Sequence, residues 1–267
     1  MDYQNFIIES LKETSEIARS SLGKVGGVLK DGDSNQVVTE TDLKIGKTIV
    51  EKIKRKFPDH NIIDEEAGAI NNKSNLTWVI DPIDGTSNFA AGSPLYGIMI
   101  GLLENDIPIA GGFALPSFSE IYIAGRGKGS YCDGERISVS REKSLKNVLV
   151  AYGIDGYPED PQITREECKL LAGIVLNIRS LRNSGGTFDT AMVARGKYGA
   201  HLNRTSKIWD NVAPQIIIEE AGGVYTDFFG NKIDYSNPFQ RIQDNFTCLT
   251  GSPQLHSQLL DIIRRGE

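Results

Sequence analysis

Residues 78–89, with the sequence WVIDPIDGTSNF, constrain the fold of this chain more than any other stretch. The first of them are aromatic and β-branched, which predicts a short buried strand. The strand ends on two acids, Asp81 and Asp84, with Pro82 stiffening the turn between them and Gly85 directly after them. Two carboxylates held close together repel each other unless a cation or a proton lies between them. The pair therefore favours a site for a hard divalent metal ion.

The residues that follow the two acids suit a phosphate group. Gly85, Thr86 and Ser87 offer backbone N–H groups and hydroxyls where a helix could begin, and helix N-termini bind anions. An ordinary Asp-Gly turn with capping residues would explain the dipeptide on its own. The complete stretch instead favours a metal site and a phosphate site that touch.

Composition and charge exclude several classes of protein. The 267 residues suffice for one large domain or two lobes, and 39% hydrophobic with 24% charged residues is typical of globular proteins. A net charge of −6 argues against nucleic-acid binding, and no apolar run approaches the roughly 20 residues of a membrane helix. The N-terminus is polar and acidic where a signal peptide would be basic and then apolar, so we expect a cytoplasmic protein.

The first half of the chain is expected to form two helices followed by strands. Apolar residues recur at helical spacing over residues 2–22 and again from residue 45 to 57, where Thr41 or Asp42 could cap the second helix. Three apolar runs over residues 97–124 predict an antiparallel meander. Between helix and meander, a short strand ends at three consecutive acids at residues 64–66. A metal-ligand role for one of the two glutamates and a solvated acidic loop are equal alternatives at this point.

The second half alternates strands and helices, which is typical of an α/β lobe. Predicted strands cover residues 148–152, 180–182, 224–226 and 248–250, and we place a lobe boundary between 1–145 and 146–267 within one structural unit. The turn at 183–187 opens a helix whose N-terminal amides could face a ligand or simply cap the turn. Asp210 begins a later helix, a position where an aspartate is most often a cap.

Taken together, these motifs resemble the inositol monophosphatase family. The chain carries DPIDGTSNF at 81–89, preceded by DEE at 64–66 and followed by WD at 209–210 and EAGG at 220–223. The resemblance runs nearly end to end, with the motifs in the family's order. It implies an α+β fold, a layered αβαβα sandwich of the sugar-phosphatase type. It also implies a magnesium-dependent, lithium-sensitive phosphatase that is usually a homodimer.

The same resemblance implies two or three Mg²⁺ ions per site. Glu65, Asp81 and the backbone carbonyl of Ile83 would hold one ion, and Asp81, Asp84 and Asp210 a second. Thr86, paired with Asp42, would orient the attacking water and help to deprotonate it, with Glu65 as a further catalytic residue and without a covalent phosphoenzyme. The implied substrate contacts are Gly85, Thr86, Ser184, Gly186, Thr187, Asn203 and Lys30.

One position departs from the family pattern. The family's substrate-contacting glutamate, seven residues ahead of the Trp-Asp aspartate, is replaced by Asn203. With Arg204 beside it, this wall of the site is expected to be neutral or cationic and to tolerate a second phosphate.

The sequence therefore predicts a phosphomonoesterase acting on a small polyol or sugar phosphate, with inositol monophosphate first. Fructose-1,6-bisphosphatase and histidinol-phosphatase activity are the alternatives, and nucleotide bisphosphates rank lower. The alternative of another class is a regulatory protein-binding partner with secondary catalysis. The partner of the site is a small phosphorylated substrate, and neither nucleic acid nor membrane is expected.

Overall fold

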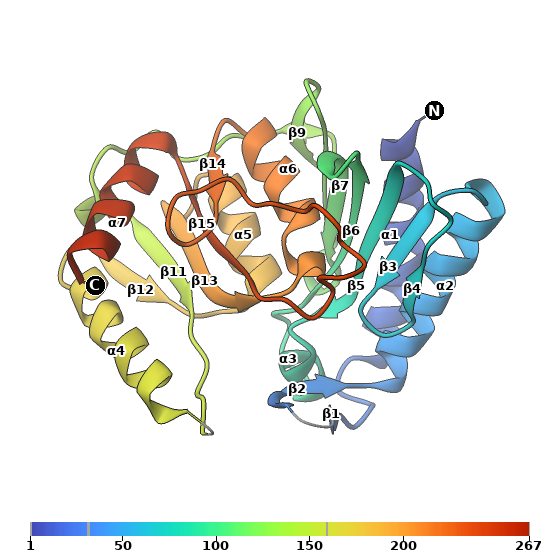
Figure 1. Ribbon diagram of the computed structural model, residues 1–267, viewed down its shortest axis with the longest axis horizontal. Coiled ribbons are helices and arrows are strands. Elements are labelled where there is room, and N and C mark those ends of the chain that lie inside the picture. The colour runs from blue at the N-terminus through green and yellow to red at the C-terminus, as the bar shows by residue number, and fades with distance from the viewer. Residues whose placement is uncertain (1, 31–32, 159, 267) are drawn as a thin grey trace.

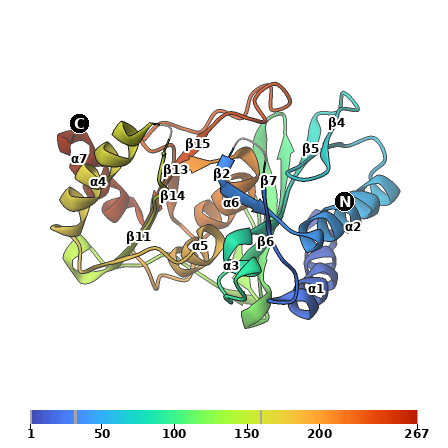
Figure 2. The ribbon, with the colours of Figure 1, turned by 90° about the horizontal axis from the view of Figure 1, so that it is seen from below.

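Two β-sheets and three layers of helices alternate through the molecule (Figure 1). The computed structural model describes residues 2–30, 33–158 and 160–266, and the side chains of residues 30 and 33–36 lie outside that description. A view turned by 90° shows the same order of layers, with α1 and α2 at one end and α4 and α7 at the other (Figure 2). The predicted αβαβα sandwich is confirmed. The helices are α1 (Tyr3–Ser21), α2 (Glu40–Lys56), α3 (Thr86–Ala90), α4 (Pro161–Val175), α5 (Gly186–Ala194), α6 (Val212–Glu220) and α7 (Pro253–Gly266).

The first sheet has eight strands in the order β10-β9-β8-β7-β6-β5-β3-β4. Its middle contains the predicted meander, β6 to β8, and the antiparallel pairing continues to β5 on one side and to β9 on the other. β3 instead runs parallel to β5, with Asp64 opposite Ile80, so Glu65, just after β3, and the acids in the last part of β5 lie at one edge of the sheet. The strands are β3 (Asn61–Asp64), β4 (Gly68–Ile70), β5 (Leu76–Asp84), β6 (Gly97–Glu104), β7 (Ile107–Leu115), β8 (Glu120–Gly125), β9 (Gly129–Cys132) and β10 (Glu135–Arg136).

The second sheet has five strands in the order β12-β11-β13-β15-β14. Its central strand β13 does not follow from the sequence patterns, because its residues AHLNRTS are largely polar. β13 runs parallel to β11, with Asn203 opposite Gly153, so the carboxyl ends of both strands lie at the same edge. The strands are β11 (Leu149–Gly153), β12 (Ser180–Arg182), β13 (Ala200–Ser206), β14 (Val224–Thr226) and β15 (Phe246–Gly251). The lobe boundary at residue 145 stays a prediction.

Smaller elements complete the chain. A two-stranded hairpin lies beside α3, and three 3₁₀ turns connect larger elements. They are β1 (Val28–Lys30), β2 (Asp33–Val38), η1 (Pro116–Phe118), η2 (Leu145–Asn147) and η3 (Ile208–Asp210). Within the described ranges, no helix is both long enough and apolar enough to cross a membrane.

The outer helices of the first sheet form as their apolar spacing predicts. α1 packs on β7 and α2 on β5, and the apolar face of α2 is fully buried at Ile45, Ile49 and Ile53. The cap of α2 is Thr39, not Thr41 or Asp42, because the Thr39 side chain accepts hydrogen bonds from the first turn. Asp42 completes a capping box by accepting the backbone N–H of Thr39.

Close packing between the two sheets fixes the position of α6 and of η3, which precedes it. α6 lies against β6 and β7 of the first sheet and also against β14 of the second. Two glycines allow this approach, since a Cβ on Gly101 would come within 2.5 Å of Val212 and one on Gly111 within 2.6 Å of Ile216. The tight contact holds the start of α6, and η3 just before it, over the edge where β5 ends.

Candidate active site

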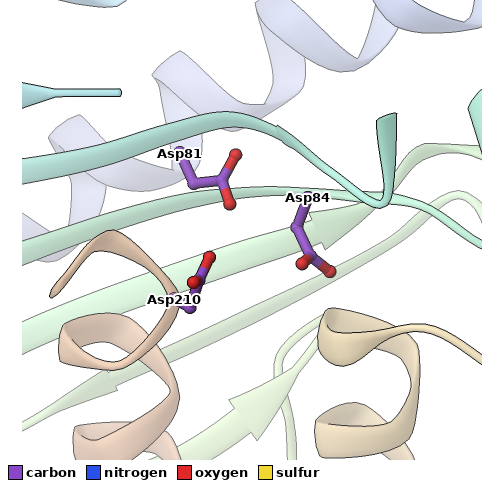
Figure 3. A group of neighbouring side chains, drawn as sticks. All are labelled: Asp81, Asp84 and Asp210. Carbon is purple, nitrogen blue, oxygen red and sulfur yellow. The ribbon is translucent and has the colours of Figure 1, made fainter. Parts of the chain in front are cut away.

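Three aspartates meet where the two sheets approach each other. Asp81 and Asp84 come from β5 and Asp210 from η3, and one carboxylate oxygen from each lies within 4.8 Å of the others. Figure 3 shows the three carboxylates facing a common space. β5 runs on through both of its acids instead of stopping before them, with a register irregularity between Asp81 and Asp84. That irregularity is needed because residues three apart on a regular strand point to opposite faces.

The cluster holds more negative charge than its surroundings balance. Asp81 is only 1% exposed, and among the described residues its Oδ1 atom has no hydrogen-bond partner. Burial raises the pKa of Asp81 well above its ordinary value, and the charges of Glu65, Asp210 and Asp84 raise it further. Burial, followed by the charge of Asp84, raises the pKa of Asp210 to about 7. A buried oxygen without a donor among several carboxylates fits a divalent cation with oxygen ligands.

Glu65 and Ile83, the other predicted metal ligands, line the same cavity as the three aspartates. Glu65 directly follows β3, and its backbone N–H donates to the carbonyl of Ile80 at 3.2 Å. The carbonyl of Ile83 accepts the Thr86 hydroxyl at 2.8 Å and keeps a second lone pair for another partner. The structure thus brings all five predicted ligands to one place, and their roles stay predictions.

Thr86 and Asp42 form the predicted pair. The Thr86 hydroxyl lies 3.1 Å from Oδ1 of Asp42, although the two residues come from α3 and α2. The other oxygen of Asp42 is held by the backbone N–H of Thr39 at 2.9 Å. Burial raises the pKa of Asp42, while its hydrogen bonds from Thr39 and Thr86 act in the opposite direction. Asp42 is therefore a fixed, buried hydrogen-bond acceptor beside the Thr86 hydroxyl.

Thr187, predicted as a substrate contact, is hydrogen-bonded to Asp84. Its backbone N–H and its hydroxyl both donate to Oδ2 of Asp84, at 2.6 and 2.5 Å. Gly97 makes room for this contact, because a Cβ there would lie 2.5 Å from the Thr187 side chain. Burial raises the pKa of Asp84, and the two hydrogen bonds from Thr187 lower it. Residues 103 positions apart form this clamp, so no local pattern in the sequence signals it.

We expect Thr187→Val to weaken divalent-cation binding by about tenfold, because partners that orient a ligating carboxylate typically contribute that much. The change removes the hydroxyl that lowers the pKa of Asp84 and keeps the side-chain volume, so protons compete better for the carboxylate. Calorimetric titration with Mg²⁺ measures the affinity without relying on turnover. Thr187→Ser keeps the hydroxyl and should bind like the unchanged protein. Equal affinity in the valine variant would contradict the orienting role.

The acidic cluster opens into a polar cavity of about 560 Å³. The predicted contacts Gly85, Thr86, Gly186, Thr187 and Asn203 line it. Ser184 is not among the described lining residues. Its backbone N–H instead donates to Asp189 and its carbonyl accepts the Asn88 side chain. The backbone of Lys30 belongs to β1, but its side chain lies outside the described residues, so its contact with phosphate stays a prediction.

The wall formed by β13 differs from the expectation of a neutral or cationic surface. Asn203 lines the cavity, but Arg204 is not among the residues that line it. Its guanidinium lies 3.8 Å from the Glu167 carboxylate of α4 and 5.3 Å from the centre of the Phe228 ring. The expectation that Arg204 helps to accept a second phosphate is wrong, because neighbouring residues on a strand point to opposite faces.

Sequence reasoning missed a histidine in the site. His201 belongs to none of the sequence motifs, yet it lines the cavity, is 4% exposed and lies 3.1 Å from the Thr190 hydroxyl. Burial lowers its pKa, so the ring is neutral at neutral pH. His201 and Asn203 are two residues apart, so on a strand their side chains point to the same face. Knowing that residues 200–206 form a strand would therefore have placed His201 beside Asn203 in the cavity.

A layered αβαβα sandwich with clustered carboxylates beside a polar cavity is the arrangement of a phosphatase. More narrowly, the chain belongs to the inositol monophosphatase family, whose family model matches residues 2–265. Members hydrolyse phosphomonoesters and depend on a metal ion. This protein is a phosphatase of that family, and its cluster of Asp81, Asp84 and Asp210 suits a metal ion.

Named relatives and solved structures agree with the family. A fructose-1,6-bisphosphatase/inositol-1-monophosphatase of Aquifex aeolicus is 30% identical, over 97% of this chain and 98% of the relative. The Nus factor SuhB of Xylella fastidiosa is 33% identical, over 72% of this chain and 69% of the relative. The solved structure of a Thermotoga maritima IMPase superposes with a TM-score of 0.87 at 28% identity, covering 100% of this chain and 98% of that one.

Proposed function

We propose that this enzyme is a magnesium-dependent phosphatase that hydrolyses a small polyol phosphate, inositol monophosphate first, by direct attack of water. One observation carries the proposal. The cluster of Asp81, Asp84 and Asp210 faces the same cavity as Thr86, which is paired with the buried Asp42. A cation site and a proton acceptor thus flank a space large enough for a phosphorylated cyclic polyol.

The positions of these groups in the cavity support the two sets of metal ligands that the family resemblance implies. Glu65, Asp81 and the carbonyl of Ile83 would hold one Mg²⁺, and Asp81, Asp84 and Asp210 a second. Bound there, the ions supply positive charge that stabilises the attacking and leaving oxygens of an in-line displacement. Asp81 belongs to both sets, and at 1% exposed it is the most deeply buried of the four acids.

Thr86 and Asp42 would move the proton of the attacking water. Thr86 Oγ1 carries one proton and faces two acceptors, the Ile83 carbonyl and Asp42 Oδ1. As the water attacks phosphorus, its proton passes to Thr86 Oγ1 and the hydroxyl proton of Thr86 passes to Asp42. The bond between phosphorus and the alcohol oxygen breaks at the same time, and that oxygen takes up a proton from water. The raised pKa of Asp42 makes it a stronger proton acceptor than an exposed aspartate.

Two helices begin at the cavity, α3 at Thr86 and α5 at Gly186. The first amides of any helix lack acceptors within the helix. The amides of Gly85, Thr86 and Gly186 are therefore suited to hold the phosphate oxygens, with the alcohol directed toward Asn203. Recognition of the phosphate then depends on the backbone, and the choice of alcohol depends on the side chains of the second sheet.

Phosphate release from a substrate panel tests the proposal. We expect release from inositol 1-phosphate to be fastest, to require Mg²⁺, to stop with a chelator and to fall when lithium is added. Fructose 1,6-bisphosphate and histidinol phosphate represent the alternatives. Release from none of these esters by folded protein that binds Mg²⁺ would refute the proposed substrate class.

Two accompanying proposals concern assembly and location. Membership in the family supports a homodimer working in the cytoplasm on a small phosphorylated substrate, with no nucleic-acid or membrane partner. Multi-angle light scattering should give twice the chain mass of 29.3 kDa. A monomer at micromolar concentration would exclude the dimer and leave the chemistry of the site untouched.

A regulatory role as a protein-binding partner is the second candidate function. The similarity to a relative named Nus factor SuhB favours it. Glu65→Ala separates the two functions, because a metal-dependent reaction should be lost with Glu65 whereas binding of a partner protein should persist. Loss of partner binding in this variant would show that catalysis and partner binding depend on the same site.

A further inference from the structure

One wall of the cavity lies away from the acidic cluster and is built by the second sheet. β11 and β13 are parallel neighbours with Gly153 opposite Asn203, so the segments that follow both strands lie at one edge. Gly153, Asp155, Asn203 and Thr205 line the cavity along this edge. A phosphate held between the acidic cluster and the helix starts would place its alcohol group against this wall.

Asp155, Asn203 and Thr205 form a connected polar group on that wall. The Thr205 hydroxyl lies 3.3 Å from Oδ2 of Asp155 and 3.3 Å from Oδ1 of Asn203. The backbone N–H of Thr205 also donates to Oδ1 of Asn203 at 2.8 Å, which fixes the orientation of the amide. Among the described residues, Oδ1 of Asp155 and Nδ2 of Asn203 have no hydrogen-bond partner. The wall therefore presents a free acceptor beside a free donor.

The charge of this wall is negative. Asp155 has no ion-pair partner in the described part of the chain, and its side chain is exposed at the cavity rim. The nearest cation in sequence, Arg204, is turned to the other face of β13 and paired with Glu167. Lys207 does line the cavity, but its ammonium group donates to the Gln243 carbonyl at 2.8 Å.

We infer that Asp155 determines the substrate preference of this enzyme, by accepting hydrogen bonds from hydroxyls of an uncharged polyol and by repelling a second phosphate on the alcohol. The inference rests on the proposed function, since it names which phosphate esters the site prefers. The observation that supports it is the group formed by Asp155, Thr205 and Asn203 at the carboxyl ends of β11 and β13.

The chemistry of the three side chains explains both halves of this preference. A carboxylate accepts hydrogen bonds and donates none, so it suits adjacent hydroxyls, and hydrogen bonds to a charged acceptor are stronger than neutral ones. A phosphate dianion in the same place would bring two negative groups together with no described cation directed at them. Asn203 supplies the donor that a hydroxyl oxygen needs, and Thr205 holds the two residues in register.

Asp155→Asn tests the inference, because it removes the charge and keeps the size and most of the hydrogen bonding. The substrates are inositol 1-phosphate, fructose 1,6-bisphosphate and p-nitrophenyl phosphate, whose leaving group carries no hydroxyl. We expect kcat/KM for inositol 1-phosphate to fall about tenfold relative to that for p-nitrophenyl phosphate, as expected for a lost charged hydrogen bond. The ratio of bisphosphate to monophosphate hydrolysis should rise by about the same factor.

Two further measurements make the result decisive. Asp261→Asn removes the same charge from the exposed face of α7 and should leave all three values unchanged. Free inositol, tested as a competitive inhibitor, should bind more weakly to the Asp155→Asn variant, which reports on the alcohol site independently of turnover.

The outcomes separate this inference from the proposed function. If the unchanged enzyme hydrolyses none of the three esters, the proposed function fails. If it hydrolyses inositol 1-phosphate but the Asp155→Asn variant keeps the same ratios and the same affinity for inositol, this inference alone is overturned. A uniform loss on all three substrates would also overturn it, because a disturbed fold does not discriminate between alcohols.

Discussion

Asp84→Asn is expected to lower turnover of any phosphomonoester by more than about a hundredfold with little change in fold. Losing a partner that only orients a ligand typically costs 10–100-fold, and loss of the ligand itself costs more. The amide keeps one oxygen toward Thr187, so the contact between β5 and α5 survives, but it loses the negative charge that a cation requires.

Steady-state kinetics in saturating Mg²⁺ with thermal unfolding of the same samples measure both quantities. The control is again Asp261→Asn on α7, which changes the net charge by the same amount at a position far from the cavity. Turnover within a few-fold of the unchanged enzyme would show that Asp84 holds no essential cation. A collapse of thermal stability would instead make its role structural.

Asp81→Asn is expected to stabilise the metal-free protein at pH 8 while abolishing its activity. Asp81 is almost completely buried among Glu65, Asp84 and Asp210, and without a cation its charge opposes folding. Replacing that charge with a neutral amide should raise the melting temperature in chelator by roughly 5 °C, since 1 kcal/mol corresponds to about 2–4 °C in a protein of this size.

The pH dependence of this effect has a definite sign. The pKa of Asp210 is raised to about 7 and that of Asp81 well above its ordinary value of 3.8. Acids with a raised pKa bind protons more tightly in the folded state, so their contribution to stability is present below pH 4 and lost as the pH rises through 7 and beyond. The gain from Asp81→Asn should therefore be large at pH 8 and small at pH 5.

Differential scanning calorimetry at both pH values, with chelator and with Mg²⁺, measures the melting temperatures of the unchanged protein and of the Asp81→Asn variant. Mg²⁺ should raise the melting temperature of the unchanged protein more at pH 8 than at pH 5, and should have little effect on the Asp81→Asn variant. The buried histidines have lowered pKa values, so their effect on the pH dependence of stability has the opposite sign. Both proteins contain these histidines, so comparing the two proteins at each pH cancels that effect. Equal melting temperatures for both proteins in chelator at pH 8 would contradict the repulsion.

This cluster illustrates why a functional site lowers the stability of its own fold. Asp81 sits on a strand between fully buried neighbours, Ile80 and Ile83, where an apolar residue would pack without penalty. The acid is tolerated there because a bound cation restores the balance of charge, so folding and cation binding are coupled.

Patterns among neighbouring residues are sufficient to predict several of the helices and strands. The helical spacing of Ile45, Ile49 and Ile53 is sufficient to predict α2, and the turns between apolar runs are sufficient to predict the meander of β6 to β8. The stretch around Asp81 and Asp84 indicates a metal and phosphate site because its acids, glycine and hydroxyls are consecutive, and the family resemblance extends this to Glu65 and Asp210.

Contacts between side chains far apart in the sequence could not be predicted without the tertiary structure. The bond of Thr187 to Asp84 depends on α5 packing against β6, and the contact of Asp155 with Thr205 depends on the pairing of β11 with β13. Arg204 was assigned to the wrong face because its strand is too polar to be predicted, and without the strand the alternation of side chains has no reference. Periodicity is a property of neighbouring residues, whereas the register of sheets and the packing of helices between them are set by contacts across the whole chain.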